Sequence, residues 1–186
     1  MVLTGGTGTR LGGVDKAALE LDGVSLLERA LAAVTAAVEV VVVGAPVPTT
    51  RPVSWTVEDP PRGGPAAGLL AGLDRFATAP ELVAVLAVDM PKVNAGTVAR
   101  LTWAVEADPG ADGAALLDRD GGRQTLAAVY RLAALSRVRA GLRDANGLSM
   151  RRLVGGLRLA EVPAVGDEAR DVDTWTDLRD LGGSGV

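Results

Sequence analysis

The sequence contains neither cysteine nor histidine. Without cysteine the chain has no disulfide, no thiolate nucleophile and no cysteine-bound zinc or iron–sulfur cluster. Without histidine it has no histidine general base, no Ser-His-Asp triad and none of the common transition-metal sites. Any catalysis must therefore use carboxylates, Lys, Arg, hydroxyls, backbone dipoles and a hard cation. Phosphoryl and nucleotidyl transfer is the large reaction class that these groups serve well.

Lysine is nearly absent as well, since Lys16 and Lys92 are the only two among nineteen basic residues. A compact ammonium group fits between phosphate oxygens where a planar guanidinium does not. A lysine kept in so arginine-rich a chain therefore suggests phosphate binding. For Lys92, chance retention is an equally good explanation.

The sequence also lacks a basic cluster, and no apolar run approaches the ~20 residues of a membrane span. With a net charge of −4, we expect neither nucleic acid nor a membrane as a partner. No signal-peptide pattern is present, so we expect a cytoplasmic protein. No coiled-coil pattern or exposed apolar stripe demands a second copy, so we expect a monomer. The length of 186 residues and the 48% hydrophobic content predict one compact domain over residues 1–186.

The most unusual stretch is the glycine-rich segment 5–13, which follows a short apolar start and contains five glycines. Glycines let backbone N–H groups turn toward an anion and approach it closely. Arg10 and Lys16 are placed to neutralise the charge of that anion. We therefore interpret the segment as a nucleotide triphosphate loop; a plain turn is the alternative. The preceding strand is so short that a start upstream of Met1 stays open.

Two common phosphate-binding motifs do not fit this segment. A Walker A loop needs Gly-Lys-Ser/Thr in direct succession, but Lys16 stands between Asp15 and Ala17. The Rossmann pattern needs a third Gly or Ala where Leu11 stands, and an acidic residue where Gly44 ends the second predicted strand. A dinucleotide site is therefore not favoured.

Apolar strands alternate with amphipathic helices along the rest of the chain, which predicts an α/β fold with a mostly parallel sheet covered on both faces. In such sheets ligands bind outside the carboxyl ends of the strands. Acidic residues follow predicted strands at Glu58-Asp59, at Asp89 and at Asp171 and Asp173, and we expect them to converge with the glycine loop. Strands are predicted at 38–43, 53–57, 82–88, 111–117, 126–130 and 157–162, and helices at about 25–37, 66–76, 94–107, 131–142, 148–154 and 174–181.

The string Leu3-Thr4-Gly5-Gly6-x-Gly8-x-Arg10-Leu11-Gly12-Gly13-x-Asp15-Lys16 resembles the nucleotidyltransferases of the GT-A-like α/β fold, and most closely the MobA family of molybdenum cofactor guanylyltransferases. Thr4 stands where the family usually has Ala, and Asp171 and Asp173 stand where Asn is frequent. A related cytidylyltransferase family often has Asp there, so the choice of base stays open. The resemblance continues through Glu58-Asp59, Gly64-Pro65-Ala66-Ala67-Gly68, Val88-Asp89-Met90-Pro91, Arg123 to Tyr130 and Asp171 to Leu178.

The resemblance implies a three-layer α/β/α Rossmann-like fold of the GT-A nucleotidyltransferase type, with a nucleotide-binding half at about 1–92 and an acceptor-binding half at about 93–181. It implies transfer of GMP from GTP to the terminal phosphate of molybdopterin, with release of pyrophosphate. The cofactor would be Mg²⁺, with Mn²⁺ as a substitute. Other proteins of molybdenum cofactor biosynthesis would be partners that deliver substrate or receive product.

Residue roles follow from the same resemblance. Leu3, Thr4 and Gly5 would contact the guanine and ribose, largely through the backbone. Asp89 would hold Mg²⁺, and Asp171 or Asp173 would reach the same ion directly or through water; we take Asp173 as the second metal ligand. The expected catalytic residues are Arg10, Lys16 and Asp89, and the expected nucleotide-binding residues are Leu3, Thr4, Gly5, Gly6, Gly8, Lys16, Asp59, Gly64 and Asp89.

Ordinary structural roles compete with several of these assignments. Asp89 could cap the helix that begins near Asn94, and Asp171 and Asp173 could be turn or cap residues before the last helix. Gln124 and Tyr130 could be plain strand residues. At the level of function, the alternatives are cytidylyl transfer, transfer to a sugar phosphate, and a nucleotide-binding sensor without catalysis.

Overall fold

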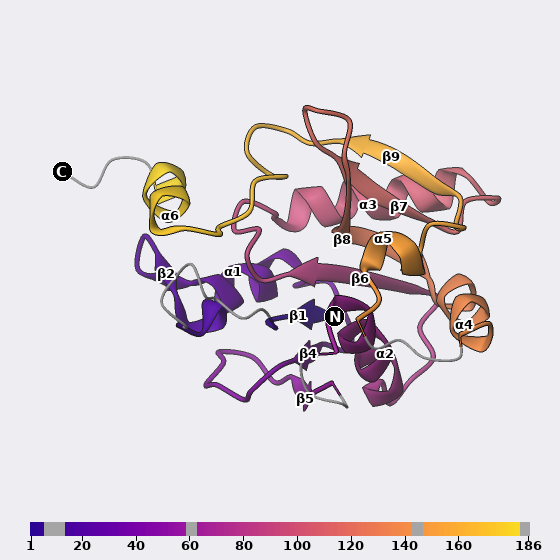
Figure 1. Cartoon of the computed structure of the whole chain (residues 1–186), viewed down its shortest axis with the longest axis horizontal. Coiled ribbons are helices and arrows are strands. Elements are labelled where there is room, and N and C mark those ends of the chain that lie inside the picture. Colours follow the sequence, from indigo (N-terminus) through magenta and orange to yellow (C-terminus); the bar gives the residue numbers. More distant parts are fainter. Residues whose placement is uncertain (6–13, 59–62, 143–146, 183–186) are drawn as a thin grey trace.

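The fold is built on a seven-stranded sheet in the order β5-β4-β1-β6-β8-β7-β9 (Figure 1). The computed structural model describes residues 1–5, 14–58, 63–142 and 147–182. All the strands of this sheet run parallel except β8, which pairs antiparallel with β6 and β7. The strands are β1 (Val2–Leu3), β4 (Val41–Val43), β5 (Ser54–Thr56), β6 (Leu82–Ala87), β7 (Gly113–Leu117), β8 (Arg123–Arg131) and β9 (Leu159–Pro163).

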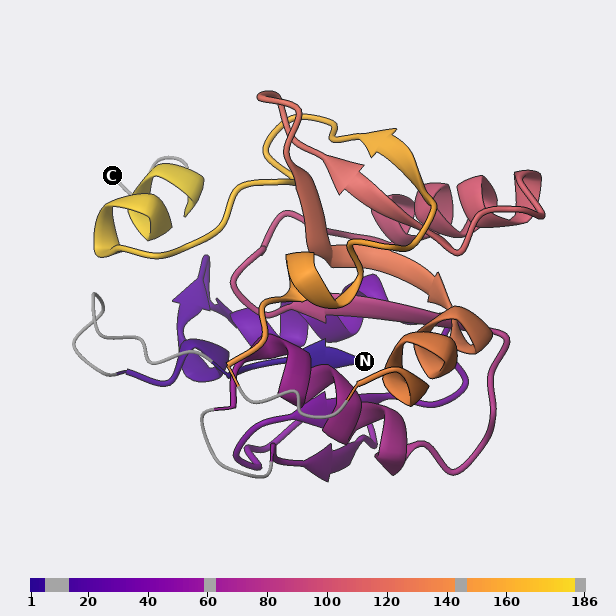
Figure 2. The ribbon, with the colours of Figure 1, turned by 45° about the vertical axis from the view of Figure 1, so that its right-hand side comes forward.

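Helices cover both faces of the sheet, which confirms the predicted three-layer α/β/α architecture (Figures 1 and 2). One face packs against α1 (Leu26–Ala33) and α3 (Ala95–Ala107). The other packs against α2 (Pro65–Arg75), α4 (Leu132–Ala140) and α5 (Met150–Leu153). Because side chains alternate across a strand, Val42 belongs to the first apolar layer, whereas its neighbours Val41 and Val43 belong to the second.

The antiparallel strand β8 brings its first residues to the edge where the parallel strands end. It is longer than the predicted strand 126–130, since it begins at Arg123 and ends at Arg131. Tyr130 is fully buried in it, and its hydroxyl donates to the carbonyl of Thr125 at 2.8 Å. Tyr130 is therefore a core residue of the strand, in agreement with the alternative that it is a plain strand residue.

A small hairpin and the last helix lie beside the main sheet. The hairpin pairs β2 (Glu20–Leu21) with β3 (Val24–Ser25), and its turn at Asp22 and Gly23 has positive φ at both residues. The last helix, α6 (Trp175–Gly182), lies next to this hairpin (Figure 1), where Gly182 approaches Leu21. The segment 171–173, which leads into α6, joins no strand pair among the described residues.

The first long helix is shorter than predicted. Ser25 caps it as expected, because its hydroxyl accepts from the N–H of Glu28 at 3.2 Å. The helix ends at Ala33 rather than near residue 37. The guanidinium of Arg51 donates instead to the carbonyls of Val34 and Ala37, so these groups need no helical partner. None of the described helices combines the length and the apolar character needed to cross a membrane.

Candidate active site

A lysine clamps two distant aspartates at the carboxyl edge of the sheet. The Nζ atom of Lys16 donates to Oδ2 of Asp89 at 2.9 Å and to Oδ1 of Asp173 at 2.9 Å. The Lys16 side chain is only 9% exposed, whereas those of Asp89 and Asp173 are 26% and 46% exposed. Solvent and ligands therefore reach the site from the side of the carboxylates.

The charge of Lys16 is stabilised by this arrangement. Burial lowers the pKa of its ammonium group, but the hydrogen bonds and charges of Asp89 and Asp173 outweigh burial. The net pKa lies above the ordinary value of 10.5, so Lys16 is protonated at neutral pH. The site thus holds a fixed positive charge, of the kind that suits a phosphate.

A short helical turn fixes the position of Lys16. The segment η2 (Lys16–Ala18) is a 3₁₀ turn, and the carboxylate of Asp15 caps it by accepting from the N–H of Ala17 at 3.0 Å. Ala17 is buried in the apolar layer under α1, which anchors the turn. The Asp15-Lys16 pair therefore combines a cap residue with the site cation.

The two aspartates have no cap function in the neighbouring helices. Asn94 itself caps α3, since its side chain accepts from the N–H groups of Gly96 and Thr97. Asp89 is thus not the cap of that helix. At α6 the cap is formed by Thr174 and Asp177, each of which accepts from the other's backbone N–H.

Two backbone contacts hold Asp173 opposite Asp89. Val172 is fully buried, and its N–H donates to the carbonyl of Asp89 at 2.8 Å. On the other side, the N–H of Asp173 donates to the carboxylate of Asp177 at 3.2 Å. The last segment of the chain is thereby fastened to the end of β6.

A third carboxylate, Asp171, stands close to this pair. Its side chain is exposed at the rim, but the surrounding chain removes part of its hydration. This loss of hydration raises the pKa of Asp171, and the charges of Asp173 and Asp89 raise it further. Among the described residues, three carboxylates therefore gather around Lys16 at the rim.

The carboxylates offer the type of donor that Mg²⁺ prefers. This ion is commonly held by one or two carboxylates, with substrate phosphates and water completing an octahedron. Among the described residues, no group of three or more acidic side chains forms a complete metal site by itself. Asp89 and Asp173 together with a triphosphate fit the ion, and their role as metal ligands stays a prediction.

Leu3, Thr4 and Gly5, which were predicted to contact the nucleotide, lie at the end of β1 on the same edge of the sheet. The carbonyl of Leu3 accepts from Val88 N–H at 3.0 Å, and the N–H of Thr4 donates to the carbonyl of Val43 at 3.0 Å. The Thr4 hydroxyl also donates to that carbonyl, at 3.0 Å. Leu3 and Thr4 are buried and bonded within the sheet, so Gly5 is the first exposed residue beyond β1.

Packing explains why Gly44 stands at the position where a dinucleotide-binding fold carries an acidic residue. A Cβ atom there would lie 1.8 Å from Oγ1 of Thr4, which is a severe clash. The buried hydroxyl of Thr4 therefore requires a glycine at the end of β4. Thr4 at the end of β1 and Gly44 at the end of β4 are therefore matched in size: the threonine side chain fills the space that the glycine leaves open.

Gly64 turns the chain into α2. Its φ of +90° is one that residues with side chains rarely adopt, and Pro65 then begins the helix. Gly64 stands at the N-terminal end of this 11-residue helix, where backbone N–H groups favour an anion. This geometry is compatible with its predicted contact to the nucleotide.

Residues 1–162 match the model of the MobA-like NTP transferase domain. The chain belongs to this family. A molybdenum cofactor guanylyltransferase from Cupriavidus necator is 36% identical over an alignment of 139 residues, and the match covers 67% of this chain and 65% of that protein. The chain thus matches slightly less than two thirds of the length of this relative.

Solved structures support the fold of this MobA-like domain. Molybdopterin-guanine dinucleotide biosynthesis protein A from Archaeoglobus fulgidus superposes with a TM-score of 0.68 at 21% identity, covering 97% of this chain and 95% of that one. The 2-C-methyl-D-erythritol 4-phosphate cytidylyltransferase from Thermus thermophilus reaches a TM-score of 0.69 at 26% identity, with the same coverage. The predicted fold type is therefore confirmed.

Several residues predicted for the MobA-like site fall outside the described parts of the chain. Their roles stay predictions. They are Gly6, Gly8, Arg10 and Asp59. One further candidate, Gln124, is described, and its side-chain amide donates to Asp118 at 2.8 Å. Gln124 thus stabilises the turn between β7 and β8.

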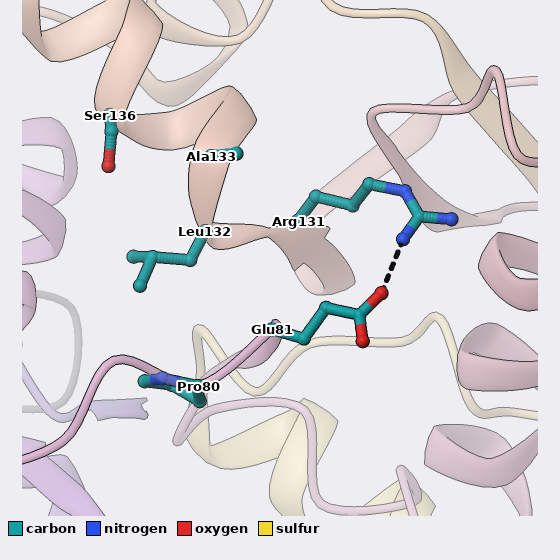
Figure 3. A pocket seen from close by; sticks show the side chains of 6 residues that line it. All are labelled: Pro80, Glu81, Arg131, Leu132, Ala133 and Ser136. Atoms are coloured by element: carbon teal, nitrogen blue, oxygen red, sulfur yellow. Dashed lines mark hydrogen bonds and ion pairs between the residues drawn. The ribbon is translucent and has the colours of Figure 1, made fainter.

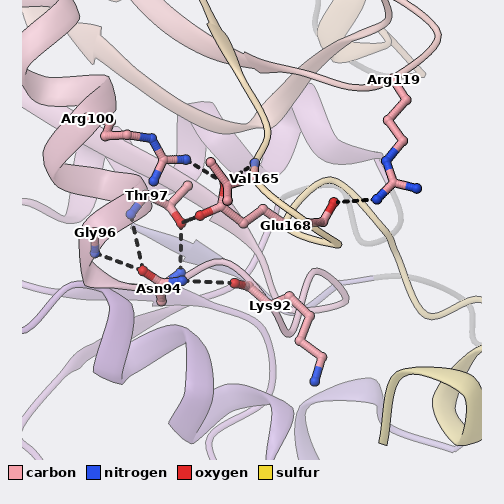
Figure 4. Close-up of polar contacts among 9 residues, drawn as sticks. Lys92, Asn94, Gly96, Thr97, Arg100, Arg119, Val165 and Glu168 are labelled. Carbon is pink, nitrogen blue, oxygen red and sulfur yellow. Dashed lines mark hydrogen bonds and ion pairs between the residues drawn. The ribbon is translucent and has the colours of Figure 1, made fainter. Parts of the chain in front are cut away.

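A buried glutamate, which the sequence pattern did not single out, holds the segment that carries Asp171 and Asp173. Glu168 lies between β9 and α6, and its carboxylate accepts from the hydroxyl of Thr97, the guanidinium of Arg100 and the N–H of Val165 (Figure 4). Thr97 and Arg100 belong to α3, so Glu168 ties the segment after β9 to that helix. Glu168 stands among other charged residues of a polar loop, so its sequence neighbours do not indicate that it is buried.

Replacing Glu168 by Gln should lower the free energy of unfolding at pH 7 by about 1–3 kcal/mol. Burial raises the pKa of Glu168, but hydrogen bonds from Arg100, Thr97 and Val165 outweigh it, so the pKa lies below the ordinary 4.5. The stabilisation is therefore present above pH 4.5 and disappears as the pH falls through the lower pKa of the folded state.

Urea denaturation of the wild type and the Glu168→Gln variant at pH 7 and at several pH values below 4.5 tests this expectation. Glu106→Gln is the matched control, because Glu106 is exposed on α3. A stability difference that is the same at every pH would contradict the assigned role of the Glu168 carboxylate.

A hollow of about 440 Å³ lies at the opposite end of the sheet (Figure 3). The two charged side chains that line it, Glu81 and Arg131, form an ion pair with each other. Arg131 bonds to Glu81 at 2.9 Å and also donates to the carbonyls of Ala111 and Val105. We assign this hollow no part in the MobA-like site. It is lined by Pro80, Glu81, Arg131, Leu132, Ala133 and Ser136.

Proposed function

We propose that this MobA-like protein transfers GMP from GTP to the terminal phosphate of molybdopterin, with release of pyrophosphate. The observation that carries the proposal is the Lys16 clamp on Asp89 and Asp173 at the carboxyl edge of the sheet. The relative from Cupriavidus necator, a molybdenum cofactor guanylyltransferase, supports this choice of reaction.

The chemistry suits a chain without histidine or cysteine. The acceptor phosphate is already an anion, so its attack on the α-phosphorus of GTP requires no general base. Rate enhancement then comes from positioning and from neutralisation of charge on the phosphates. Lys16 supplies a fixed ammonium for this purpose, and the proposal gives Arg10 the same task.

Mg²⁺, or Mn²⁺ in its place, would be held by Asp89 and Asp173 and would neutralise and orient the phosphates when bound. Lys16 separates the two carboxylates and limits their mutual repulsion, so they are positioned for a cation before it arrives. The proposal also holds that the protein is cytoplasmic and monomeric. It would receive its substrate from, and pass its product to, other proteins of molybdenum cofactor synthesis.

Cytidylyl transfer is the second candidate. The observation in its favour is the fold similarity to a cytidylyltransferase at 26% identity, slightly more than the identity to the guanine dinucleotide protein. Asp171 and Asp173, where the guanylyltransferases frequently have Asn, point in the same direction. Base choice therefore has to be measured.

The deciding experiment incubates the protein with molybdopterin, Mg²⁺ and either GTP or CTP, and measures pyrophosphate. We expect release with GTP, and its loss when EDTA removes the metal. Preference for CTP would replace guanylyl by cytidylyl transfer. In a parallel set of reactions, sugar phosphates replace molybdopterin as the acceptor. If no pyrophosphate forms with either acceptor, nucleotidyl transfer is excluded and a nucleotide-binding sensor remains.

A further inference from the structure

One acidic side chain at the nucleotide half of the edge has no role in the site described above. Glu58 follows β5, and β4 separates that strand from β1. Its Oε2 atom lies 3.3 Å from the place where a Cβ of Gly68 would stand and 3.8 Å from the place for a Cβ of Gly5. Since neighbouring strands are about 4.8 Å apart, the side chain reaches across the end of β4 to the end of β1.

Two glycines make room for this carboxylate. A side chain at Gly68, in the middle of α2, would meet Oε2 of Glu58 and also Leu3 and Val43. A glycine inside a helix costs about 1 kcal/mol relative to alanine. Gly5 is exposed, so the carboxylate lies beside backbone that a ligand can reach.

The carboxylate of Glu58 is partly buried, and no hydrogen bond or ion pair joins it to another residue in the described parts of the chain. An ionised carboxylate only accepts hydrogen bonds, and at this partly exposed position water can donate them when no ligand is bound. A ligand that displaces this water and presents N–H or O–H donors keeps the carboxylate hydrogen-bonded, whereas a ligand that presents acceptors leaves it unpaired at a cost.

The sheet order indicates which part of a nucleotide meets Glu58. Phosphates are drawn to Lys16, which contacts Asp89 beyond β6, on the other side of β1. Glu58 repels phosphates because it carries the same sign of charge. A nucleotide with its phosphates at Lys16 therefore extends its nucleoside across β1 toward Glu58.

Among the common bases, guanine alone has two adjacent donors on its Watson–Crick edge, at N1 and at the 2-amino group. Cytosine and adenine place a ring acceptor next to their amino group, and uracil has one N–H between two carbonyls. A carboxylate accepts two parallel hydrogen bonds from a pair of adjacent donors. Glu58 therefore matches guanine and disfavours cytosine.

We propose that Glu58 determines base specificity by accepting hydrogen bonds from N1–H and the 2-amino group of guanine. The inference rests on the proposed function only in assuming that this edge binds a nucleoside triphosphate. It assigns the choice of guanine to a residue at the end of β5, in addition to the backbone at Gly5.

Equilibrium binding of GTP, ITP and XTP tests the proposal, because without an acceptor no nucleotide is consumed. ITP lacks the 2-amino group, so the wild type should bind GTP about tenfold to a hundredfold more tightly than ITP. In the Glu58→Gln variant, the amide oxygen accepts from N1–H and the amide nitrogen donates to the 2-carbonyl of xanthine. This variant should therefore prefer XTP to GTP.

Glu81→Gln is the matched control, because Glu81 lies at the opposite end of the sheet with Arg131 (Figure 3). It should keep the wild-type order of affinities. A gain of XTP binding cannot result from misfolding, and the comparison of GTP with ITP in the wild type needs no variant at all.

Two results would overturn the proposal. One is equal affinity of the wild type for GTP and ITP. The other is a Glu58→Gln variant that loses GTP, ITP and XTP in equal proportion, which would place the carboxylate on the ribose hydroxyls. If the nucleotides bind as expected but no guanylyl transfer occurs, the proposed function is rejected and the inference on Glu58 stands.

If guanylyl transfer occurs but the Glu58→Gln variant keeps the base preference of the wild type, the inference on Glu58 is rejected and the proposed function stands.

Discussion

Replacing Lys16 by Ala should lower the rate of guanylyl transfer by about a hundredfold or more. The ammonium group is the positive charge that the structure places between Asp89 and Asp173. Its removal takes away the cation that joins Asp89 to Asp173 and one of the positive charges proposed to meet the incoming phosphates. Because this stabilisation grows with the charge of the transition state, kcat should fall together with kcat/KM.

The measurement is pyrophosphate release under saturating GTP and Mg²⁺, with circular dichroism to confirm folding. Lys92→Ala is the matched control, since it removes the other lysine of the chain. Lys16→Arg should restore only part of the rate, because a planar guanidinium does not fit the space of an ammonium between phosphate oxygens. A folded Lys16→Ala variant with the activity of the wild type would contradict the assigned role.

Asp89→Asn should also reduce the transfer rate, by about a hundredfold. The amide keeps the size of the side chain but loses its charge, so it binds Mg²⁺ weakly. It also leaves Lys16 with Asp173 as the one remaining carboxylate of the clamp. The concentration of Mg²⁺ needed for half-maximal activity should therefore rise, and excess Mg²⁺ or Mn²⁺ should restore part of the rate.

Titration of activity with Mg²⁺ in the wild type and in Asp89→Asn separates this effect from a loss of folding. Asp180→Asn serves as the control, because Asp180 is exposed on α6. If Asp89→Asn kept both the wild-type rate and the wild-type Mg²⁺ requirement, Asp89 would not be a metal ligand.

Much of the fold was predictable because its signals are local. Runs such as 40–43 and 82–88 are apolar throughout, as strands covered on both faces are, and capping residues such as Ser25 and Asn94 mark where helices begin. These patterns predicted the three layers and most of the element boundaries. They did not predict the direction of β8, since the same apolar alternation suits a parallel and an antiparallel neighbour.

The candidate site was predictable in part for a different reason. Parallel strands bring their carboxyl ends to one edge, so acidic residues after separate strands were expected to meet there. Asp89 and Asp173 do meet at Lys16. The sequence alone also allowed Asp171 or Asp173 to cap α6, but the folded chain uses Thr174 and Asp177 for that cap.

The sequence by itself determined the chemistry available to this protein and the order of its elements, because composition and periodicity are properties of short stretches. Tertiary structure alone decided which charges are paired. It placed Lys16 against residues 73 and 157 positions further along the chain. It also placed the carboxylate of Glu58 between Gly5 and Gly68 and buried Glu168 beneath α3. The physical reason is that pairing and burial depend on strand order and helix packing, which bring distant segments together and leave no signal in either segment.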